Sequence, residues 1–468
     1  MPVLPNKTHP FKDLKTLHCF LSEFQQSRFS TDTPAITTVV FDIDPVDPLA
    51  VIQTAIQNGT AHFYLEKPST HEAIASFGVA HRITADGPQR FRTIQRQLTA
   101  WNAAVRSPEA LKHQYFLGSF TFFDQNDAPE YGFLPGELVL PQWQVIRRQN
   151  QYQAIAHLPQ PAYGNLEPLT ETLWHQFQTI IQAELRPSLT PGIAPLSQFW
   201  QTDELQSFPS AVVSALQAIQ QNQVHKLVLA HALDVFSPIP FDAVQSLQNL
   251  RQLHPDCRVF SVNHGGSTTF LGASPETLVR IREGRLMTDA LAGSAARGRT
   301  LIEDAALGQQ LLHSPKERHE HQIVVDFLSD RLTQLTITPQ GRPTPELLKL
   351  SNIQHLHTPL YGSMPADLHA MDILATLHPT PAVAGIPPQT AMELIQKHES
   401  FGRSLYAAPI GWVDAAGNAE FIVGIRSALL TGHHARLFAG AGIVSGSDPQ
   451  REQAEVNLKL QALLRALA

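Results

Sequence analysis

The chain has 468 residues, a formal net charge of −7 at pH 7 and two cysteines, Cys19 and Cys257. This length and a hydrophobic content of 43% are typical of a folded protein with a core that needs no metal or disulfide support. The negative charge argues against a nucleic-acid or anionic-membrane surface spread over the chain. We find no pattern of a signal peptide or of a membrane span. We therefore expect a reduced, cytoplasmic protein with no nucleic-acid or membrane partner.

The first half of the chain alternates short apolar runs with turn residues, which is typical of strands. The predicted strands cover residues 37–41, 60–64, 115–123 and 137–140, and residues 94–105 have the pattern of a helix. A stretch rich in proline and glycine follows at 187–195 and indicates a connection. We divide the chain into residues 1–195 and residues 196–468, and the second part carries nearly all the motifs.

The first motif places a lysine on a strand. Residues 210–221 predict a helix and residues 224–235 a strand, whose alternation puts Lys226 on one face with Val224, Val228 and Ala230. A lysine among apolar side chains loses hydration, which lowers its pKa and lets it act as a general base. The alternative is a lysine at a strand end that reaches water.

A carboxyl group follows the next predicted strand. Residues 270–276 end in a small-residue turn with Glu276 beside it, where desolvation would raise the pKa of the carboxyl and make it a general acid. The alternative is a helix start in which Glu276 favours the helix dipole. Residues 291–298, with Gly293 and Ser294, predict a further turn after a strand at 285–290. Small residues there let a ligand approach the backbone.

A helix begins at Ser314 with the pattern of a capping box, in which Glu317 occupies the third helical position. Glu320 lies one turn before the apolar face of this helix, where a buried carboxylate needs a partner or a metal ion.

The last helix begins after Asp448 and carries Glu452, Glu455 and Lys459 beside its apolar stripe. An exposed i,i+4 ion pair would account for Glu455 and Lys459. The alternative is that the acidic starts of both helices converge on one Mg²⁺ ion, which takes carboxylate oxygens, water and an anionic substrate.

Two elements between these helices favour an anionic ligand. A predicted strand at 421–426 ends in Arg426, and a guanidinium group can bind a carboxylate through two hydrogen bonds. Residues 438–444 predict a strand that enters a glycine turn at Gly440 and Gly442, where free backbone N–H groups can bind an anion.

In this order, the motifs resemble those of the chorismate-utilising enzymes, which include anthranilate, aminodeoxychorismate, salicylate and isochorismate synthases. The resemblance covers residues 199–468. It is carried by Phe-Leu-Gly-Ala-Ser-Pro-Glu, Leu-Ala-Gly-Ser, Glu-x-x-Glu-His, Ala-Gly-Ala-Gly-Ile-Val and a terminal Glu-x-x-Glu-x-x-x-Lys. It implies an α+β fold of the anthranilate synthase component I type. In this fold antiparallel sheets are flanked by helices, the active site lies in a cleft between them, and the first half of the chain belongs to the same fold.

The resemblance also implies roles for single residues. Lys226 would activate water, and Glu276 would protonate the departing C4 hydroxyl of chorismate. Mg²⁺ would be bound by Glu320 and Glu455, with support from Glu317 and Glu452. The residues expected to contact the substrate are Gly293, Ser294, His355, Ala382, Tyr406, Arg426, Gly440, Gly442 and Lys459.

Two segments favour isochorismate synthases among these enzymes. Aminating relatives often have Gln where Lys226 stands, so the lysine favours water as the nucleophile. The Pro-Ala-Val-Ala-Gly segment at 381–385 resembles isochorismate synthases, whereas salicylate synthases have a Thr-bearing stretch before a Gly-x-Pro.

We therefore expect a Mg²⁺-dependent isomerase that converts chorismate to isochorismate, for menaquinone or phylloquinone biosynthesis, as a monomer without a glutaminase subunit. The alternatives are a salicylate-forming lyase, an aminating synthase, an isochorismate synthase of a siderophore pathway, and a non-catalytic protein that binds chorismate or Mg²⁺.

Two residues depart from the family pattern. His231 stands where relatives often have Arg, and Asp289 precedes Ala-Leu-Ala-Gly where relatives have other residues. We expect neither to touch the acid/base pair.

Overall fold

The structure is a computed structural model of the whole chain. It describes residues 13–26, 36–105, 111–159, 166–185, 200–202, 207–341 and 344–467. The stretch at 187–195, on which the division of the chain rests, lies outside these residues. Among the described helices, none combines the length and the hydropathy that a membrane span requires.

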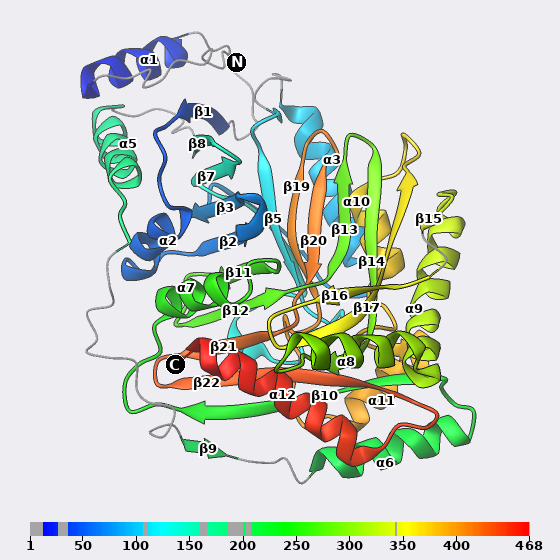
Figure 1. Cartoon of the computed structure of the whole chain (residues 1–468). Coiled ribbons are helices and arrows are strands. Elements are labelled where there is room, and N and C mark those ends of the chain that lie inside the picture. The colour runs from blue at the N-terminus through cyan, green and yellow to red at the C-terminus, as the bar shows by residue number, and fades with distance from the viewer. Residues whose placement is uncertain are drawn as a thin grey trace.

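Two large antiparallel sheets form the framework of the molecule (Figure 1). The larger has 12 strands. Its spatial order is β1 (Ile36–Asp42), β8 (Gln151–Pro159), β7 (Trp143–Arg148), β3 (Glu72–Phe77), β2 (His62–Lys67), β11 (Arg258–Asn263), β12 (Thr268–Ser274), β21 (Ser427–Thr431), β22 (His434–Val444), β10 (Lys226–Phe236) and β18 (Gly385–Ile386), with β9 (Trp200–Thr202) beside β10.

The second sheet has 10 strands. Its spatial order is β15 (Gln340–Gly341), β17 (Ile353–Ser363), β14 (Arg285–Ala296), β13 (Thr277–Arg282), β20 (Ala419–Val423), β19 (Pro409–Asp414), β5 (Tyr115–Phe120), β6 (Gly136–Leu140) and β4 (His81–Ala85), with β16 (Glu346–Lys349) beside β17.

Strands from both halves of the sequence pair with each other in both sheets. In the larger sheet β2 pairs with β11, and in the smaller sheet β5 pairs with β19. Buried aromatic rings fill the space between strands of different halves, as in the contact of Phe120 with Phe421. The first half therefore shares both sheets with the motif-rich half.

Helices cover the outer faces of the sheets (Figure 1). Against the larger sheet pack α2, α6, α7, α11 and α12, and against the smaller sheet pack α3, α8, α9 and α10, while α1 packs on α5. Their bounds are α1 (Leu14–Gln26), α2 (Pro48–Gln57), α3 (Arg90–Ala104), α5 (Leu166–Ile181), α6 (Ser207–Gln220), α7 (Ala243–Leu253), α8 (Leu301–His313), α9 (Pro315–Gln334), α10 (Ala370–Leu377), α11 (Pro388–His398) and α12 (Pro449–Leu467). Two short 3-10 helices occupy Pro68–Thr70 and Pro129–Tyr131.

Two predicted turns are strands in the structure. The predicted turn at 291–298 lies largely within β14, which continues to Ala296 and has a register shift between Ala292 and Ser294. Gly293 has a φ of +76° at this bulge, a conformation that glycine adopts without strain. The predicted glycine turn at 440–442 is also wrong, because β22 pairs with β10 through both glycines.

Candidate active site

A cavity of about 670 Å³, open to solvent, brings most of the predicted residues together. Strands β10 and β22 of the larger sheet form one wall and strands β14 and β17 of the smaller sheet form another, while α9 and α12 provide charged side chains. All the predicted site residues line this cavity except Lys226, Glu317 and Glu452.

The predicted acid is Glu276, which lies in a tight turn between β12 and β13 and not at a helix start. The Ser274 Oγ accepts a hydrogen bond from the Glu276 N–H at 3.2 Å and donates one to the Val423 carbonyl at 2.6 Å, which fixes the turn. The Glu276 side chain is buried and lines the cavity. Burial, and then the charge of Asp289, raise the pKa of Glu276 to about 8, so the carboxyl holds its proton at neutral pH.

The predicted base, Lys226, is fully buried at the start of β10. Its Nζ lies 2.9 Å from Glu320 Oε1 on α9. Besides the buried apolar neighbours that the sequence predicted, Lys226 therefore has a carboxylate partner from a distant helix. Gly442 of β22 leaves room for this pair, since a Cβ there would lie 2.1 Å from Glu320 Oε1.

Lysines separate the four glutamates that were expected to bind Mg²⁺. Lys316 Nζ contacts Glu452 at 2.8 Å and Glu317 at 3.3 Å, while Glu320 is paired with Lys226. Glu317 Oε2 also accepts a hydrogen bond from the Ser294 N–H at 3.2 Å, and not from the start of its own helix. Of the predicted capping box, only the hydrogen bond from the Glu317 N–H to the Ser314 Oγ is therefore present.

The electrostatics of these glutamates suit a cation. Burial raises the pKa of both Glu317 and Glu452, and the charge of Lys316 opposes it. Glu455 raises both pKa values further, and Glu320 also raises that of Glu317. Such mutual repulsion is relieved by a bound cation.

Two of the four, Glu320 and Glu455, line the cavity itself. Among the described residues, no group of three or more His, Cys, Asp or Glu side chains is arranged to hold a metal ion. One or two carboxylates and the substrate are, however, the usual protein contribution to a Mg²⁺ site. Glu320 and Glu455 are thus the carboxylates that this cavity would offer to a Mg²⁺ ion.

Glu455 and Lys459 form the i,i+4 ion pair that the sequence predicted, at 2.5 Å, but they line the cavity instead of an open surface. Lys459 Nζ also donates to the Gly440 carbonyl at 2.8 Å, and Ser294 Oγ donates to Glu455 at 3.0 Å. Although burial opposes it, these partners lower the pKa of Glu455 to about 2, so this carboxylate is ionised at neutral pH.

Arg426 enters the cavity from the connection between β20 and β21, with a φ of +53°. Its Nη2 lies 3.1 Å from His355 Nε2. Burial, and then the charge of Arg426, lower the pKa of His355 to about 3, so the imidazole is neutral and accepts this hydrogen bond. Tyr406 stacks on Phe438 beside them and stays protonated, because burial raises its pKa. Together these groups offer hydrogen-bond donors to a carboxylate ligand.

The two departures from the family pattern lie in different places. His231 packs against Phe208 of α6 and does not line the cavity. Asp289, however, accepts a hydrogen bond from the Thr277 N–H, next to the acid, and its charge raises the pKa of Glu276. Asp289 thus contacts the residue next to the acid and acts on Glu276 through its charge.

Sequence reasoning also missed a buried pair that supports β10. Glu399 Oε1 accepts a hydrogen bond from the Ala230 N–H at 2.7 Å, and Arg403 donates to the carbonyls of Val228 and Val383 at 3.0 and 2.8 Å. Two charged residues at i and i+4 resemble a surface ion pair, so the sequence alone gives no signal for this role.

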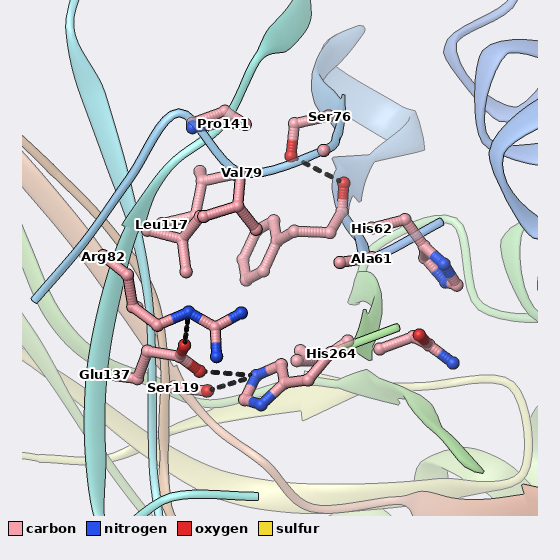
Figure 2. A pocket seen from close by; sticks show the side chains of 16 residues that line it. Ala61, His62, Ser76, Val79, Arg82, Leu117, Ser119, Glu137, Pro141 and His264 are labelled. Carbon is pink, nitrogen blue, oxygen red and sulfur yellow. Dashed lines mark hydrogen bonds and ion pairs between the residues drawn. The ribbon is translucent and has the colours of Figure 1, made fainter. Parts of the chain in front are cut away.

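A second cavity, of about 400 Å³, lies among β2–β6 and β11 (Figure 2). The buried Glu137 there is ion-paired with Arg82 Nε and His264 Nε2, both at 2.9 Å. None of the predicted site residues lines this cavity. Most of them line the first cavity, which makes it the candidate active site.

Known sequences resemble this chain over most of its length. Residues 22–468 match the family described as "Chorismate binding enzyme". The salicylate biosynthesis isochorismate synthase of Pseudomonas aeruginosa is 35% identical over 461 residues, which are 97% of this chain and 95% of that protein. The isochorismate synthase MenF of Bacillus subtilis is 38% identical over 257 residues, 55% of this chain and 54% of that protein.

Solved structures confirm the expected fold class. MenF, the menaquinone-specific isochorismate synthase from Escherichia coli, matches with a TM-score of 0.79 and 27% identity, over 97% of this chain and 100% of that one. Anthranilate synthase component I from Streptococcus pneumoniae has the same fold, with a TM-score of 0.63 and 20% identity over 99% of this chain and 100% of that one. The chain belongs to the family of chorismate-binding enzymes.

Proposed function

We propose that the protein converts chorismate to isochorismate. The observation that carries this proposal is the buried Glu276 carboxyl, which keeps its proton to about pH 8 and faces a cavity that also holds Arg426 and Lys459. An acid that is protonated at neutral pH can give its proton to a leaving hydroxyl, and the cations can bind the carboxylates of a dianionic substrate. The names of the relatives, all but one of them isochorismate synthases, support this reaction.

The chemistry divides between two residues. Lys226 takes a proton from a water molecule while the oxygen of that water attacks C2 of the chorismate ring. The ring double bonds shift, and the C4 hydroxyl takes the proton of Glu276 and leaves as water. Lys226 must be neutral to accept this proton, and Glu320 Oε1, at 2.9 Å, is the group that can exchange a proton with it. Arg426 and Lys459 orient the substrate, while Tyr406 and Ala382 line the cavity around its ring.

We propose Mg²⁺ as the cofactor, with Glu320 and Glu455 as its protein ligands and Glu317 and Glu452 as supporting charges. The ion would neutralise and orient the ring carboxylate of the substrate. Calorimetric titration of the substrate-free protein with Mg²⁺ tests this assignment without turnover. We expect binding that is lost in Glu455→Gln and unchanged in Glu167→Gln, which alters an exposed residue of α5. Equal binding by all three proteins would contradict it.

The pathway that consumes isochorismate is the subject of a separate and more specific proposal. The sequence analysis favoured menaquinone or phylloquinone biosynthesis, and the E. coli neighbour is menaquinone-specific by its title. The P. aeruginosa relative is named for salicylate biosynthesis. Both routes start from isochorismate, so the reaction proposed here is the same for each.

The decisive experiment incubates the purified protein with chorismate and Mg²⁺ and separates the products by chromatography, with a parallel assay for pyruvate. We expect a mixture of chorismate and isochorismate, no pyruvate, and loss of conversion with EDTA. Pyruvate with salicylate would show a lyase, and pyruvate with an aminated product that needs ammonia would show an aminating synthase. Either of these outcomes, or no product, would overturn the proposal.

A further inference from the structure

Asp289 lies on β14, directly behind the turn that carries the acid. Its Oδ2 accepts a hydrogen bond from the Thr277 N–H at 3.1 Å, and its Oδ1 lies 2.8 Å from Nε2 of His357 on β17. The Asp289 side chain is almost fully buried. One carboxylate thus connects the residue after Glu276 with an imidazole on the neighbouring strand.

The turn around Glu276 is held on both sides of the acid. Ser274 binds the Glu276 N–H on one side, and Asp289 binds the Thr277 N–H on the other. A neutral oxygen acceptor, such as an asparagine carbonyl, could also bind the Thr277 N–H. Placing a second buried carboxylate beside an acid disfavours the charged form of that acid. The hydrogen bond to the Thr277 N–H therefore does not require a charged acceptor, and the charge of Asp289 serves a second purpose.

We propose that Asp289 is a positioning residue for Glu276 that fixes its turn and favours its protonated form, and that His357 moderates the charge of Asp289. This inference rests on the role of Glu276 in the proposed function.

The charges around the acid support this reading. Burial contributes most to the raised pKa of Glu276, Asp289 raises it further, and Lys226 opposes both. Burial would lower the pKa of His357, but Asp289, and then Glu346 at 3.5 Å, raise it above its ordinary value. Whenever His357 is protonated, its charge offsets part of the negative charge that acts on Glu276, and the raised pKa of His357 extends the pH range in which it does so.

Other charged groups near this turn are already paired. Strand β20 and helix α10 also pack against β13. They carry Glu420, which is bound to Arg258, and Asp372, which accepts a hydrogen bond from Gln95. The cavity adds Glu320, which is paired with Lys226, and Arg426. Asp289 and Lys226 are thus the two charges that act on Glu276.

Two variants should move the pH at which Glu276 loses its proton in opposite directions. Asp289→Asn removes the negative charge, so Glu276 loses its proton at a lower pH. His357→Gln keeps a side-chain N–H for Asp289 but removes the positive charge, so Glu276 keeps its proton to a higher pH. We expect shifts of about one pH unit in each direction, as is usual for a charge at short range.

The first readout is the infrared carbonyl band of the protonated Glu276 carboxyl, recorded against pH in substrate-free protein and identified by its absence in Glu276→Gln. The second is the alkaline limb of the pH profile of kcat/KM for chorismate, which we expect to move with the band. Asp289→Glu restores a carboxylate and should return the band toward its wild-type pH.

The matched control is Asp414→Asn, which alters another buried aspartate that accepts backbone N–H groups, but at a turn outside the cavity. The Asp414→Asn variant should leave the carbonyl band of Glu276 at its wild-type pH. An unshifted band in folded Asp289→Asn, or shifts of the same sign in both test variants, would overturn the proposal. If Asp289→Asn does not fold, the His357→Gln band decides. A wild-type protein that makes no isochorismate would refute the proposed function, whereas the band titration would still test Asp289.

Discussion

The two groups that the reaction needs, Lys226 and Glu276, are both buried but have opposite surroundings. The ammonium of Lys226 faces a carboxylate, Glu320, at 2.9 Å. The carboxyl of Glu276 is influenced by a second carboxylate, Asp289, which raises its pKa. Burial disfavours the charged form of Glu276 and the neighbouring carboxylate strengthens this effect, whereas the neighbour of Lys226 is a partner of opposite charge.

Glu276 lines the cavity, whereas Lys226 is buried behind the cavity wall, next to Gly442. The acid is kept protonated by its permanent surroundings before substrate binds. The proposed base is paired with a residue that is also a proposed Mg²⁺ ligand, so a change at Glu320 would affect both roles. Substitutions at either group test this contrast.

The largest effect is expected for Glu276→Gln. The amide has nearly the same shape but no acidic proton, so the C4 hydroxyl would leave unassisted. A positioned general acid contributes about 10²–10⁴-fold to a rate, and we expect kcat to fall by this order. Timed chromatography of chorismate and isochorismate measures the loss. Glu167→Gln on α5 is the control, and a kcat within a few-fold of wild type in Glu276→Gln would remove this residue from the acid role.

Loss of the base should lower kcat by a similar order and also disturb the fold. Lys226→Met leaves Glu320 as a buried carboxylate without its partner, which typically costs about 3–5 kcal/mol. Glu320→Gln leaves the lysine unpaired in the same way. The double variant removes both charges and should recover most of the free energy of unfolding, but no activity. Urea denaturation of the four proteins gives the coupling energy, and additive losses would show that the pair does not interact.

Much of this site could be predicted from the sequence because its residues lie in short motifs. Glu276, Ser294, Glu320 and Glu455 lie in the short motifs that carry the resemblance to the chorismate-utilising enzymes. They line one cavity in the structure. The expected strand at 224–235 and the helix beginning at Ser314 are also present, as β10 and α9.

The features of the site that the sequence did not predict depend on contacts between segments far apart in the chain. Alternation placed Lys226 among apolar neighbours on its own strand, but its partner Glu320 comes from a helix 94 positions later. Glycines at 440 and 442 suggested a turn, whereas the structure uses them for space within β22, beside Tyr406 and Glu320. Asp289 seemed unrelated to the acid because strand pairing, and not sequence distance, brings it to Thr277.

The raised pKa of Glu276 also predicts how stability depends on pH. The unfolded chain releases this proton near the ordinary value of 4.5, whereas the folded protein keeps it to about 8. The stability that this proton provides is fully present below the lower value and is lost as pH rises through the window, by roughly 1.4 kcal/mol per unit. Glu276→Gln lacks this loss.

We therefore expect the difference in free energy of unfolding, Glu276→Gln minus wild type, to grow by a few kcal/mol between these two pH values and to be constant above them. Urea titrations at matched pH values measure it, and the other ionisable groups cancel in the difference. Parallel pH profiles for the two proteins would show that Glu276 titrates normally in the folded state.

The smallest predicted effect concerns the space around the base. In Gly442→Ala the new Cβ would lie 2.1 Å from Glu320 Oε1 and 3.0 Å from Lys226 Cε, so the ion pair must move. Overpacking of this kind typically costs about 1–3 kcal/mol. Gly266→Ala is the matched control, because a Cβ there meets nothing within 4 Å.

We expect Gly442→Ala to lower both the free energy of unfolding and kcat, and Gly266→Ala to change neither by more than a small amount. The infrared band of Glu276 should stay at its wild-type pH in Gly266→Ala, because that substitution moves neither Asp289 nor Lys226, the two charges that act on the acid. A Gly442→Ala protein with normal stability and turnover would mean that the Lys226–Glu320 pair can rearrange freely. The base would then be held less rigidly than the acid, whose turn is fixed on both sides by Ser274 and Asp289.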